Sequence, residues 1–484
     1  MRSARKHARM MVDGVWLMVH EAGSNGVYSS GPMAGAKTCS GSFGRSVSAE
    51  PDKISLIHRA ETFAGQVVVP SHAIRTNHQP FTIPVEDGDA YGGNHSRSAR
   101  LCADRGTTGL YVHVPFCDGK CAYCAFYSVG YKPALADRYL NSLECELAAS
   151  LPLAPETIYI GGGTPSVLSA RQIDRLCRLL QTQVDTCRLV EWSVEINPGS
   201  VDAEKAAVLA AAGVNRVSLG AQSFDDRILK TLGRRHSAAD TVKAVTILRA
   251  AGIANIGLDL IACVPGCARA LWRKTLRQAV ALAPKHVSVY ALTNEEGTRL
   301  NRLLGQGSAA LLSDEAQLAM LDLAETELIQ AESGQAESGQ AGLGLAGFER
   351  YEISNYARSG FKCRHNVACW RGEQYVGLGP AAASHVGLKR WTNRADVSAY
   401  LAAIEAGRNP PRDVEVLTPA LKRQERVIFG LRMAEGVAVS MASEYKHALH
   451  ALRADGLVDL RDGRWKLTAR GRDLADYVAV ELIR

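Results

Sequence analysis

From Leu110 onward, short apolar runs alternate with longer amphipathic segments, and this alternation constrains the fold more than any other feature of the sequence. The apolar runs predict six strands, over residues 110–116, 157–163, 191–197, 216–222, 255–262 and 286–292. Helical patterns lie between them, over 135–151, 170–184, 203–212, 238–251 and 270–282. Repeated β-α units place their strands in parallel, so the sequence predicts an α/β fold whose units form an open or closed barrel.

The first predicted strand is followed by three cysteines in the spacing C-x3-C-x2-C, at Cys117, Cys121 and Cys124. Parallel α/β folds carry their sites at the carboxyl ends of the strands, where this loop begins. Thiolates suit iron–sulfur clusters, and one loop of this spacing can present three sulfurs to one 4Fe–4S cluster, leaving one iron open to a substrate or small cofactor. The alternatives are ordinary core cysteines or a zinc knuckle, which would need a second pair of ligands that the sequence lacks.

Composition limits the class of protein. The chain has 484 residues, enough for two or more domains, and 46% of them are apolar, as in a soluble globular protein. The net charge of +7 is spread without a long Lys/Arg block, so we expect no nucleic-acid partner. No run of about 18 uninterrupted apolar residues occurs, so no membrane span is expected. Twelve cysteines without a convincing export signal indicate a reducing compartment, and we expect a cytoplasmic protein.

Residues 1–107 differ from the rest, since they are rich in Ser, Gly, His and Arg and show little sustained periodicity. We interpret them as a disordered or mis-started N-terminal extension, with an organelle-targeting segment as the alternative. Within them, Gln66–Pro70 predicts a short strand. Residues 108–330 are expected to form the barrel. The five-residue repeat Ala331–Gln335 and Ala336–Gln340 then begins a low-complexity linker over 331–347.

Residues 348–484 are expected to form a smaller, α-rich C-terminal domain. We interpret its first part, 349–395, as a dense loop-rich segment. The tail predicts helices over 420–432 and 441–455, followed by short strands over 457–459 and 465–468. This order is typical of a winged-helix-like domain, and such a domain can pack against its neighbour without binding nucleic acid.

The run Tyr111-Val-His-Val-Pro-Phe-Cys, with the two cysteines that follow, resembles the radical S-adenosylmethionine (SAM) enzymes, and more narrowly the oxygen-independent coproporphyrinogen III oxidase family. The resemblance implies a partial (β/α)6 radical-SAM barrel. It also implies that SAM chelates the open iron, and that an electron from a flavodoxin- or ferredoxin-type donor cleaves SAM to a 5′-deoxyadenosyl radical. The cofactor supplies this chemistry, and the protein orients it and excludes water and oxygen.

Glycines and polar residues at later strand ends fit the same resemblance. Gly161-Gly-Gly-Thr-Pro165 follows the second strand, and its glycines allow the backbone close to a ligand. Glu195 lies in an apolar strand, where a carboxylate is costly unless it is bonded. Each such residue alone could be a cap, a turn or a satisfied buried polar group. No residue is assigned a catalytic role, and the SAM site that the resemblance implies consists of Tyr111, Tyr123, Gly162, Gly163, Thr164, Glu195, Gln222, Arg234, Asp259 and Ala291.

Phe126 separates two branches of the family. The oxidase motif extends to a fourth cysteine two residues after the third, and this chain has Phe126 there. The departure resembles the heme chaperone (HemW-type) branch, whose members bind heme and deliver it to acceptor proteins. We therefore expect heme, SAM and a 4Fe–4S cluster as cofactors, and a heme-acceptor protein as partner. The oxidase, acting on a porphyrin ligand, and another radical-SAM enzyme stay as alternatives, so enzymatic activity is left open.

The branch also implies a heme-associated motif, HNxxYW, which here reads His365-Asn-Val-Ala-Cys369-Trp. A neutral imidazole is a common axial ligand of heme iron, so His365 is the candidate ligand and Cys369 a second candidate. The alternative is that His365 is a hydrogen-bonding loop residue and Cys369 a small core replacement.

Replacing Cys121 with alanine should abolish cluster assembly, because two thiolates from this loop cannot hold a stable cubane. Iron and sulfide content and visible absorbance after anaerobic reconstitution measure this. A Cys121→Ala protein that keeps its full iron content would contradict the cluster assignment.

Overall fold

The computed structural model of the chain describes residues 7–12, 15–20, 108–150, 152–330 and 347–483. The first two ranges form an antiparallel hairpin of β1 (His7–Val12) and β2 (Val15–His20), which the sequence did not predict within its N-terminal extension. The strand expected at Gln66–Pro70 lies outside the described residues, and so does the five-residue repeat of the expected linker.

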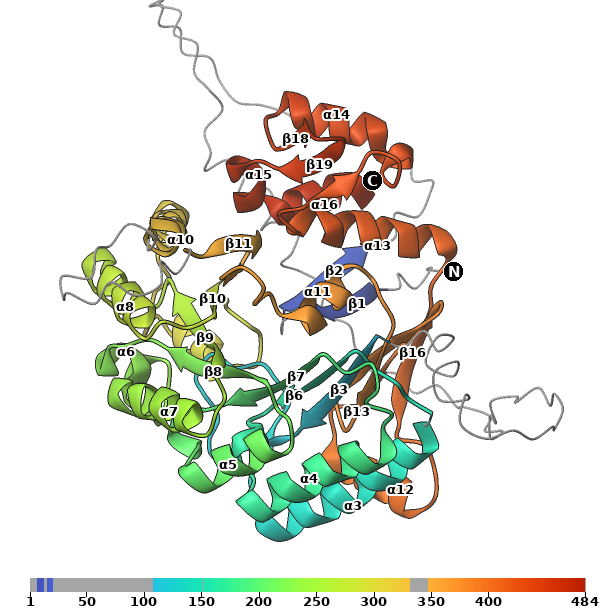
Figure 1. Ribbon diagram of the computed structural model, residues 1–484. Coiled ribbons are helices and arrows are strands. Elements are labelled where there is room, and N and C mark those ends of the chain that lie inside the picture. Colours follow the sequence, from blue (N-terminus) through green and yellow to red (C-terminus); the bar gives the residue numbers. More distant parts are fainter. Residues whose placement is uncertain (1–6, 13–14, 21–107, 151, 331–346, 484) are drawn as a thin grey trace, which may run out of the picture. The chain divides into compact units, whose positions relative to one another are not determined.

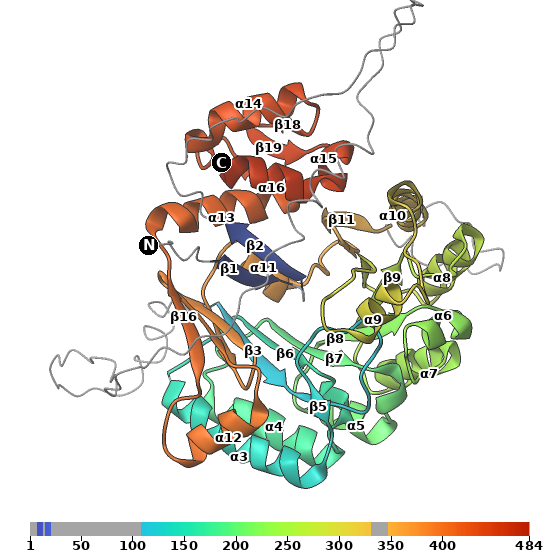
Figure 2. The same ribbon diagram turned by 180° about the vertical axis from the view of Figure 1, so that it is seen from behind.

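Six parallel strands form the centre of the fold, seen in Figure 1 and from behind in Figure 2. Each pairs with the next along the chain, in the order β3 (Gly109–Val114), β6 (Thr157–Gly162), β7 (Glu191–Ile196), β8 (Arg216–Gln222), β9 (Asn255–Ala262) and β10 (His286–Ala291). These bounds lie within two residues of the six predicted strands, so the parallel α/β core predicted from the alternation is confirmed.

The intervening helices lie along the outer side of these strands in both ribbon views (Figure 1, Figure 2). Their starts follow from the local sequence. The hydroxyls of Ser169 and Ser237 cap the helices that begin at Ala170 and Ala238 through capping boxes, and the carboxylates of Asp202 and Asp225 cap those that begin at Ala203 and Asp226. The helices are α3 (Pro133–Ser150), α4 (Ala170–Gln183), α5 (Ala203–Ala211), α6 (Asp226–Thr231), α7 (Ala238–Ala250) and α8 (Arg269–Ala281), and α9 (Arg299–Gly305) and α10 (Asp314–Ile329) follow β10.

The six strands have an apolar outer face and a largely polar inner face. Side chains alternate across a strand, and on the outer face Val112, Ile160 and Leu258 are buried in the core shared with the helices. A parallel strand with apolar surroundings on both faces usually has apolar residues at nearly every position. The polar residues at alternate positions here therefore indicate an interior that forms hydrogen bonds and can bind ligands. That inner row carries Tyr111, His113, Thr157, Tyr159, Glu191, Ser193, Glu195, Arg216, Ser218, Asp259, His286 and Ser288.

Later segments of the chain extend the sheet at both ends. In the described sheet β3 and β10 pair with these later segments and not with each other, so the six parallel strands do not close into a barrel. The loop-rich interpretation of 349–395 is therefore wrong, and the segment also contains α11 (Arg364–Trp370). The added strands are too short to show a period of two and pair with distant segments, so no local pattern reveals them. Beside β3 lie β13 (Tyr375–Leu378), β14 (Ala383–Val386), β15 (Lys389–Asn393) and β16 (Arg412–Val416), and beside β10 lie β12 (Asn355–Ala357) and β11 (Glu349–Glu352).

The tail has its own three-stranded sheet, in the order β17 (Val437–Ala438), β19 (Arg464–Leu467) and β18 (Val458–Arg461), with helices packed around it. Its elements are α13 (Pro419–Arg432), β17 (Val437–Ala438), α14 (Lys446–Ala454), β18 (Val458–Arg461), β19 (Arg464–Leu467), α15 (Ala469–Asp473) and α16 (Ala475–Ile483). The order of helices and strands agrees with the winged-helix-like prediction. Since 349–416 supplies strands to the main sheet, we propose that the smaller domain begins near residue 417 rather than at 348.

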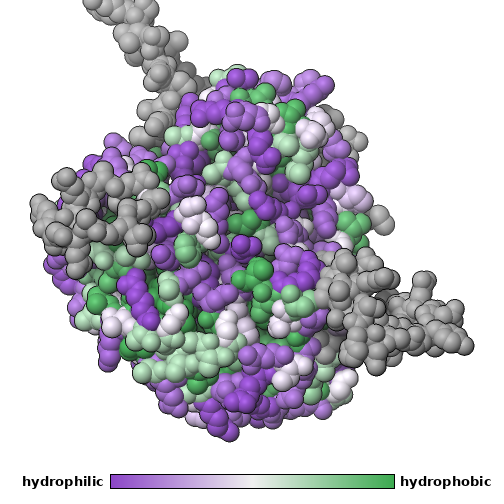
Figure 3. All heavy atoms as spheres, in the orientation of Figure 1, coloured by the Kyte–Doolittle hydropathy of each residue, from purple (hydrophilic) through white to green (hydrophobic). Residues whose placement is uncertain are grey.

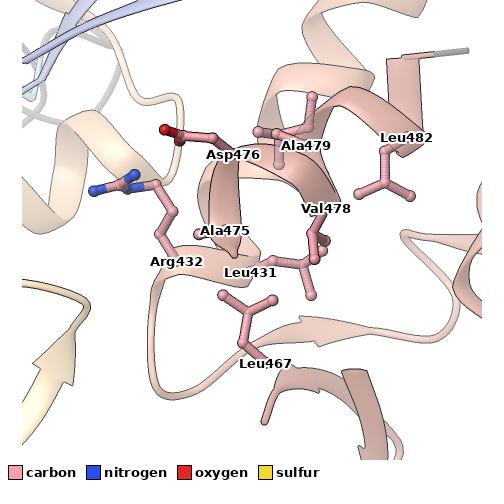
Figure 4. Close-up of a pocket in the computed structure, with 9 residues that line it drawn as sticks. Leu431, Arg432, Leu467, Ala475, Asp476, Val478, Ala479 and Leu482 are labelled. Carbon is pink, nitrogen blue, oxygen red and sulfur yellow. The ribbon is translucent and has the colours of Figure 1, made fainter. Parts of the chain in front are cut away.

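A small cavity lies between α13 and α16 in the tail (Figure 4). Apolar side chains such as Leu431, Val478 and Leu482 line it, and it has hardly the room of one water molecule. It is therefore a packing gap rather than a ligand site.

Figure 3 shows hydrophilic and apolar residues interspersed over the described part of one face. None of the helices formed by the described residues combines the length and the apolar character that crossing a lipid bilayer requires.

Helix α13 connects both ends of the extended sheet. Glu425 Oε1 lies 3.0 Å from Arg390 Nη1 of β15, and both side chains are 5% exposed. Nearer the end of the helix, Arg432 Nη2 lies 2.9 Å from Glu352 Oε1 of β11. Because β11 and β15 stand near opposite ends of the strand order, one helix holds the two edges of the open sheet.

Glu425→Ala should lower the free energy of unfolding by about 3 kcal/mol, because Arg390 then stays buried without this partner. The expected loss lies at the low end for a buried pair, since Glu415 also accepts a hydrogen bond from Arg390. The exposed pair Arg138–Glu405 is the matched control, and Arg138→Ala should cost less than about 1 kcal/mol. Denaturant unfolding measures both variants, and equal losses would contradict the role of the buried pair.

Candidate functional site

The three-cysteine loop leaves the carboxyl end of β3 and is closed by two short paired strands, β4 (Phe116–Cys117) and β5 (Val129–Gly130). Its middle is anchored by backbone hydrogen bonds. Ala122 N donates to Leu232 O at 2.9 Å, and Ala122 O accepts from Leu300 N at 2.7 Å. The backbone that carries the cysteines is therefore held at its base and at its centre.

The thiols of Cys117, Cys121 and Cys124 are all partly exposed. Cys117 Sγ lies 3.4 Å from Thr164 Oγ1, and Nη1 of Arg234 lies 3.5 Å from Cys121 Sγ. Burial raises the pKa of Cys124, and the nearness of the other two thiols adds to the rise. Cys117 and Cys121 are thus close enough to Cys124 to act on it electrostatically.

The thiols are not arranged as ligands of one ion. Among the described residues, no three His, Cys, Asp or Glu side chains converge closely enough to hold a single metal ion. A cubane needs a wider arrangement, because each cysteine binds a different iron. Three thiolates on one loop match the donor set of a cluster with an open iron, whereas a structural zinc ion takes four ligands.

The glycine turn after β6 lies against the start of the cysteine loop. Gly163 N donates to Val114 O at 2.8 Å, and Thr164 N donates to Phe116 O at 2.7 Å. A Cβ on Gly163 would lie 2.5 Å from Phe116 O, and Gly162 has a φ of +105°, which strains any other residue. Both predicted glycines are therefore needed to bring the turn this close to the loop.

Glu195 stands in the inner row of β7, and two donors hold its carboxylate. Tyr159 Oη donates to Oε1 at 2.9 Å, and Gly162 N donates to Oε2 at 3.1 Å. Burial raises the pKa of Glu195 to about 7, with a further rise from the Asp259 carboxylate, while the two hydrogen bonds lower it. The carboxylate is therefore fixed in orientation and titrates near neutrality.

Arg234 and Asp259 place opposite charges at the same ends of the strands. Arg234 Nη2 donates to Asn197 Oδ1 and to Gly220 O, both at 2.8 Å, while its buried Nε has no hydrogen-bond partner among the described residues. Ser218 Oγ donates to the Asp259 carboxylate at 3.0 Å, and burial raises the pKa of Asp259. Both side chains are anchored by hydrogen bonds, and Nε of Arg234 keeps the capacity to donate to a ligand.

Gln222 ends β8 at a bulge. The pairing with β9 shifts register between Leu219 and Gln222, and Gln222 has a φ of +63°. A left-handed backbone is uncommon for a residue other than glycine, and bulges of this kind re-aim side chains beside binding sites.

The three cysteines and all ten predicted SAM residues are partly exposed, whereas outer-row neighbours such as Val112, Ile160 and Leu258 are buried. These residues keep some exposed surface, and burial is still strong enough to raise the pKa of Glu195. This combination is typical of side chains in a sheltered site that a ligand can reach. Ala291 shares the strand parity of the buried Val287 and Val289, so its backbone, rather than its side chain, can contribute. The other residues come together at the carboxyl ends of the strands and on the cysteine loop.

The structure does not bring His365 to these residues. His365 is the second residue of α11 and lies at the amino end of the strands, where its Nδ1 is 2.9 Å from Oγ1 of Thr157, the first residue of β6. Burial lowers its pKa to about 4, so the imidazole is neutral. Cys369, on the same helix, is partly exposed. The candidate heme ligand and the cysteine loop therefore lie at opposite ends of the strands.

Sequence reasoning missed the residues that orient the predicted ones. Tyr159 holds Glu195, and Asn197 holds Arg234. His113 Nδ1 lies 3.1 Å from Tyr111 Oη, and its Nε2 lies 3.1 Å from Tyr127 O on the cysteine loop. Tyr159 and His113 stand in the polar inner row, so following the period of two along each strand could have found them.

Comparison with known proteins identifies the family. A model of the radical SAM superfamily matches residues 111–278, and a model of the HemN C-terminal domain matches 417–474. The heme chaperone HemW of Mycobacterium tuberculosis is 36% identical over 385 residues, which cover 78% of this chain and 94% of that protein. The chain belongs to the HemW family of radical SAM proteins. The HemW of Bacillus subtilis is 33% identical over 361 residues, covering 73% of this chain and 90% of its own length.

The HemW family assignment confirms the branch that the sequence predicted.

Among solved structures, the coproporphyrinogen III oxidase (HemN) of Escherichia coli matches with a TM-score of 0.65 at 22% identity, over 81% of this chain and 93% of that one. At this identity the likeness concerns the fold alone, and it supports the radical-SAM α/β architecture followed by a smaller domain.

Proposed function

We propose that this protein is a heme chaperone, which binds heme, holds a SAM-coordinated 4Fe–4S cluster and transfers heme to acceptor proteins. The observation that carries the proposal is its likeness to HemW proteins named heme chaperones, over 94% of the length of one of them. Phe126, in place of the fourth cysteine of the oxidase motif, supports this branch over the oxygen-independent coproporphyrinogen III oxidase.

The residues at the strand ends fit the cofactors of the radical SAM superfamily. Cys117, Cys121 and Cys124 on one anchored loop are three soft donors for a cubane with an open iron. The unpartnered Nε of Arg234 can donate to a ligand oxygen. Because Gly163 has no Cβ, the backbone of its turn can lie close to the loop and to a small ligand.

When bound, the cluster and SAM supply radical chemistry, while the protein binds and orients them. We assign the backbone of Gly162 and Gly163 to the amino-acid end of SAM. The Glu195 carboxylate, held in place by Tyr159 and Gly162, would accept hydrogen bonds from a ribose hydroxyl or from the SAM ammonium. Arg234 Nη1 lies 3.5 Å from Cys121 Sγ, so its guanidinium borders the proposed cluster site.

Heme ligation is assigned to α11. His365 stays the predicted axial ligand, with Cys369 as the second candidate. Since Thr157 engages Nδ1 of His365, its Nε2 would be the nitrogen that binds iron. The cytoplasmic location, the flavodoxin- or ferredoxin-type electron donor and the absence of a nucleic-acid partner stay predictions.

Glu195→Gln should remove the pH dependence of SAM binding near neutrality. With a carboxylate pKa of about 7, the affinity of cluster-loaded wild-type protein should fall as the pH drops, because protonation removes the negative charge. Below the pKa the fall approaches about tenfold per pH unit. Calorimetric titration with SAM between about pH 6 and about pH 8 measures this. The control Glu405→Gln changes an exposed carboxylate on α12 (Val397–Glu405) and should keep the wild-type profile.

A paired incubation distinguishes the chaperone from the oxidase. Anaerobically reconstituted protein receives heme in one sample, and coproporphyrinogen III with SAM and a reductant in the other. We expect stoichiometric heme binding with a Soret band, and no loss of propionate carboxylates. Formation of protoporphyrinogen together with 5′-deoxyadenosine would overturn the proposal. Cys121→Ala measures the background of the second sample, because it lacks the cluster.

A further inference from the structure

Strands β6 and β7 connect α11 at their amino ends with the predicted SAM site at their carboxyl ends. At the amino end, the Glu191 carboxylate accepts hydrogen bonds from the backbone N of Arg364 at 2.9 Å and of His365 at 3.2 Å. Four residues further along the same strand, Glu195 accepts the hydroxyl of Tyr159. One strand therefore carries both the carboxylate that anchors α11 and the carboxylate of the SAM site.

The His365 ring is held on three sides. Its Nδ1 bonds Thr157 Oγ1 at 2.9 Å, and its ring stacks on that of Tyr159 with 5.1 Å between centroids and 29° between planes. On neighbouring β3, a Cβ at Gly109 would lie 3.1 Å from Cε1 of His365, so the strand packs directly on the imidazole. With 6% of its surface exposed, the ring has little freedom to move.

Tyr159 transmits this constraint. One face of its ring lies against His365, and the ring of Tyr111, its partner in the β3–β6 register, is 6.3 Å away between centroids and tilted by 31°. A tyrosine side chain has two rotatable bonds before its hydroxyl, so contacts on the ring fix the hydroxyl. That hydroxyl donates to Glu195 Oε1 at 2.9 Å.

We propose that His365 is a positioning residue for the SAM site, holding the Tyr159 ring so that its hydroxyl donates to Glu195. The inference rests on the proposed function in one respect, that Glu195 contacts SAM. It gives the histidine of the HNxxCW segment a role at the carboxyl ends of the strands, although the residue lies at their amino ends. Loss of the ring frees Tyr159 to turn, and Glu195 then loses a bond that orients it and stabilises its ionised form.

Two substitutions of His365 separate ring support from iron ligation. His365→Ala removes the ring, so SAM should bind cluster-loaded protein roughly tenfold more weakly, the lower end of what losing an orienting partner costs a site. The pH midpoint of SAM binding should also move upward, because the lost bond favoured the ionised carboxylate. His365→Phe keeps a ring to stack on Tyr159, so its SAM affinity should stay close to wild type, while the Thr157 hydroxyl keeps the hydrogen bond that it donates to Thr108 O at 3.4 Å.

Further variants test the route through Tyr159. Tyr159→Phe removes the hydroxyl and should match His365→Ala, and the double variant should be no weaker than Tyr159→Phe alone, because both changes break one interaction. His286→Gln is the matched control. His286 is a buried histidine at the same end of the strands, bonded to Tyr351 Oη at 2.8 Å, and its variant should keep the wild-type pH midpoint.

An unchanged affinity and midpoint in His365→Ala would overturn the inference, and so would a loss that adds to that of Tyr159→Phe. The Soret bands of both heme-loaded His365 variants should differ from that of wild type, because both changes remove the Nε2 proposed to bind iron. A change of that band in both His365 variants, with SAM binding unchanged in both, would leave His365 an iron ligand without the positioning role and would overturn the inference. Wild-type protein that binds SAM but no heme would refute the proposed function while leaving this test readable. A wild type that binds no SAM would overturn both.

Discussion

The structure depends on the alternation of side chains across six parallel strands. One row is apolar and packs under the helices, and the other row is polar and faces inward. A buried polar row is stable only when its members bond one another, as Tyr159 does with Glu195 and Ser218 with Asp259. Some capacity stays unused among the described residues, including Nε of Arg216 and Nε of Arg234. An unpaired buried group costs about 1–3 kcal/mol, so this interior gives up stability for the ability to bind.

Segments far apart in the sequence keep the two ends of these strands in place. Near the cysteine loop, the buried Glu146 of α3 accepts hydrogen bonds from Gly379 N at 2.7 Å and from Asn393 Nδ2 and Tyr400 Oη at 2.8 Å. The chain after β13 is thereby fixed beside β3. At the amino ends, Glu191 anchors α11. With α13 linking β11 to β15, the open sheet is held without closure by strand pairing.

Local patterns made part of the site predictable. The spacing of Cys117, Cys121 and Cys124 identified the loop, and Gly163 and Glu195 stood out because a glycine run and a carboxylate are unusual at the ends of apolar strands. Gln222 was assigned to the SAM site from the family resemblance alone, and no local pattern predicts the β-bulge at which it lies. The strands of 349–395 were missed because each has too few residues to show a period, and each owes its conformation to a distant partner.

The sequence by itself determined the order of strands and helices from β3 to β10, the cysteine loop at the end of β3 and the branch of the family. These follow from the period of side chains, from capping residues and from ligand spacing, all of which act between neighbours in the chain. Only the tertiary structure decided which residues orient the site and where His365 lies. Tyr159 and His365 are 206 positions apart, as their numbers 159 and 365 show, yet their rings stack at 5.1 Å. Such a contact depends on the register of paired strands and on where a later helix packs. The residues next to Tyr159 and His365 in the sequence determine neither.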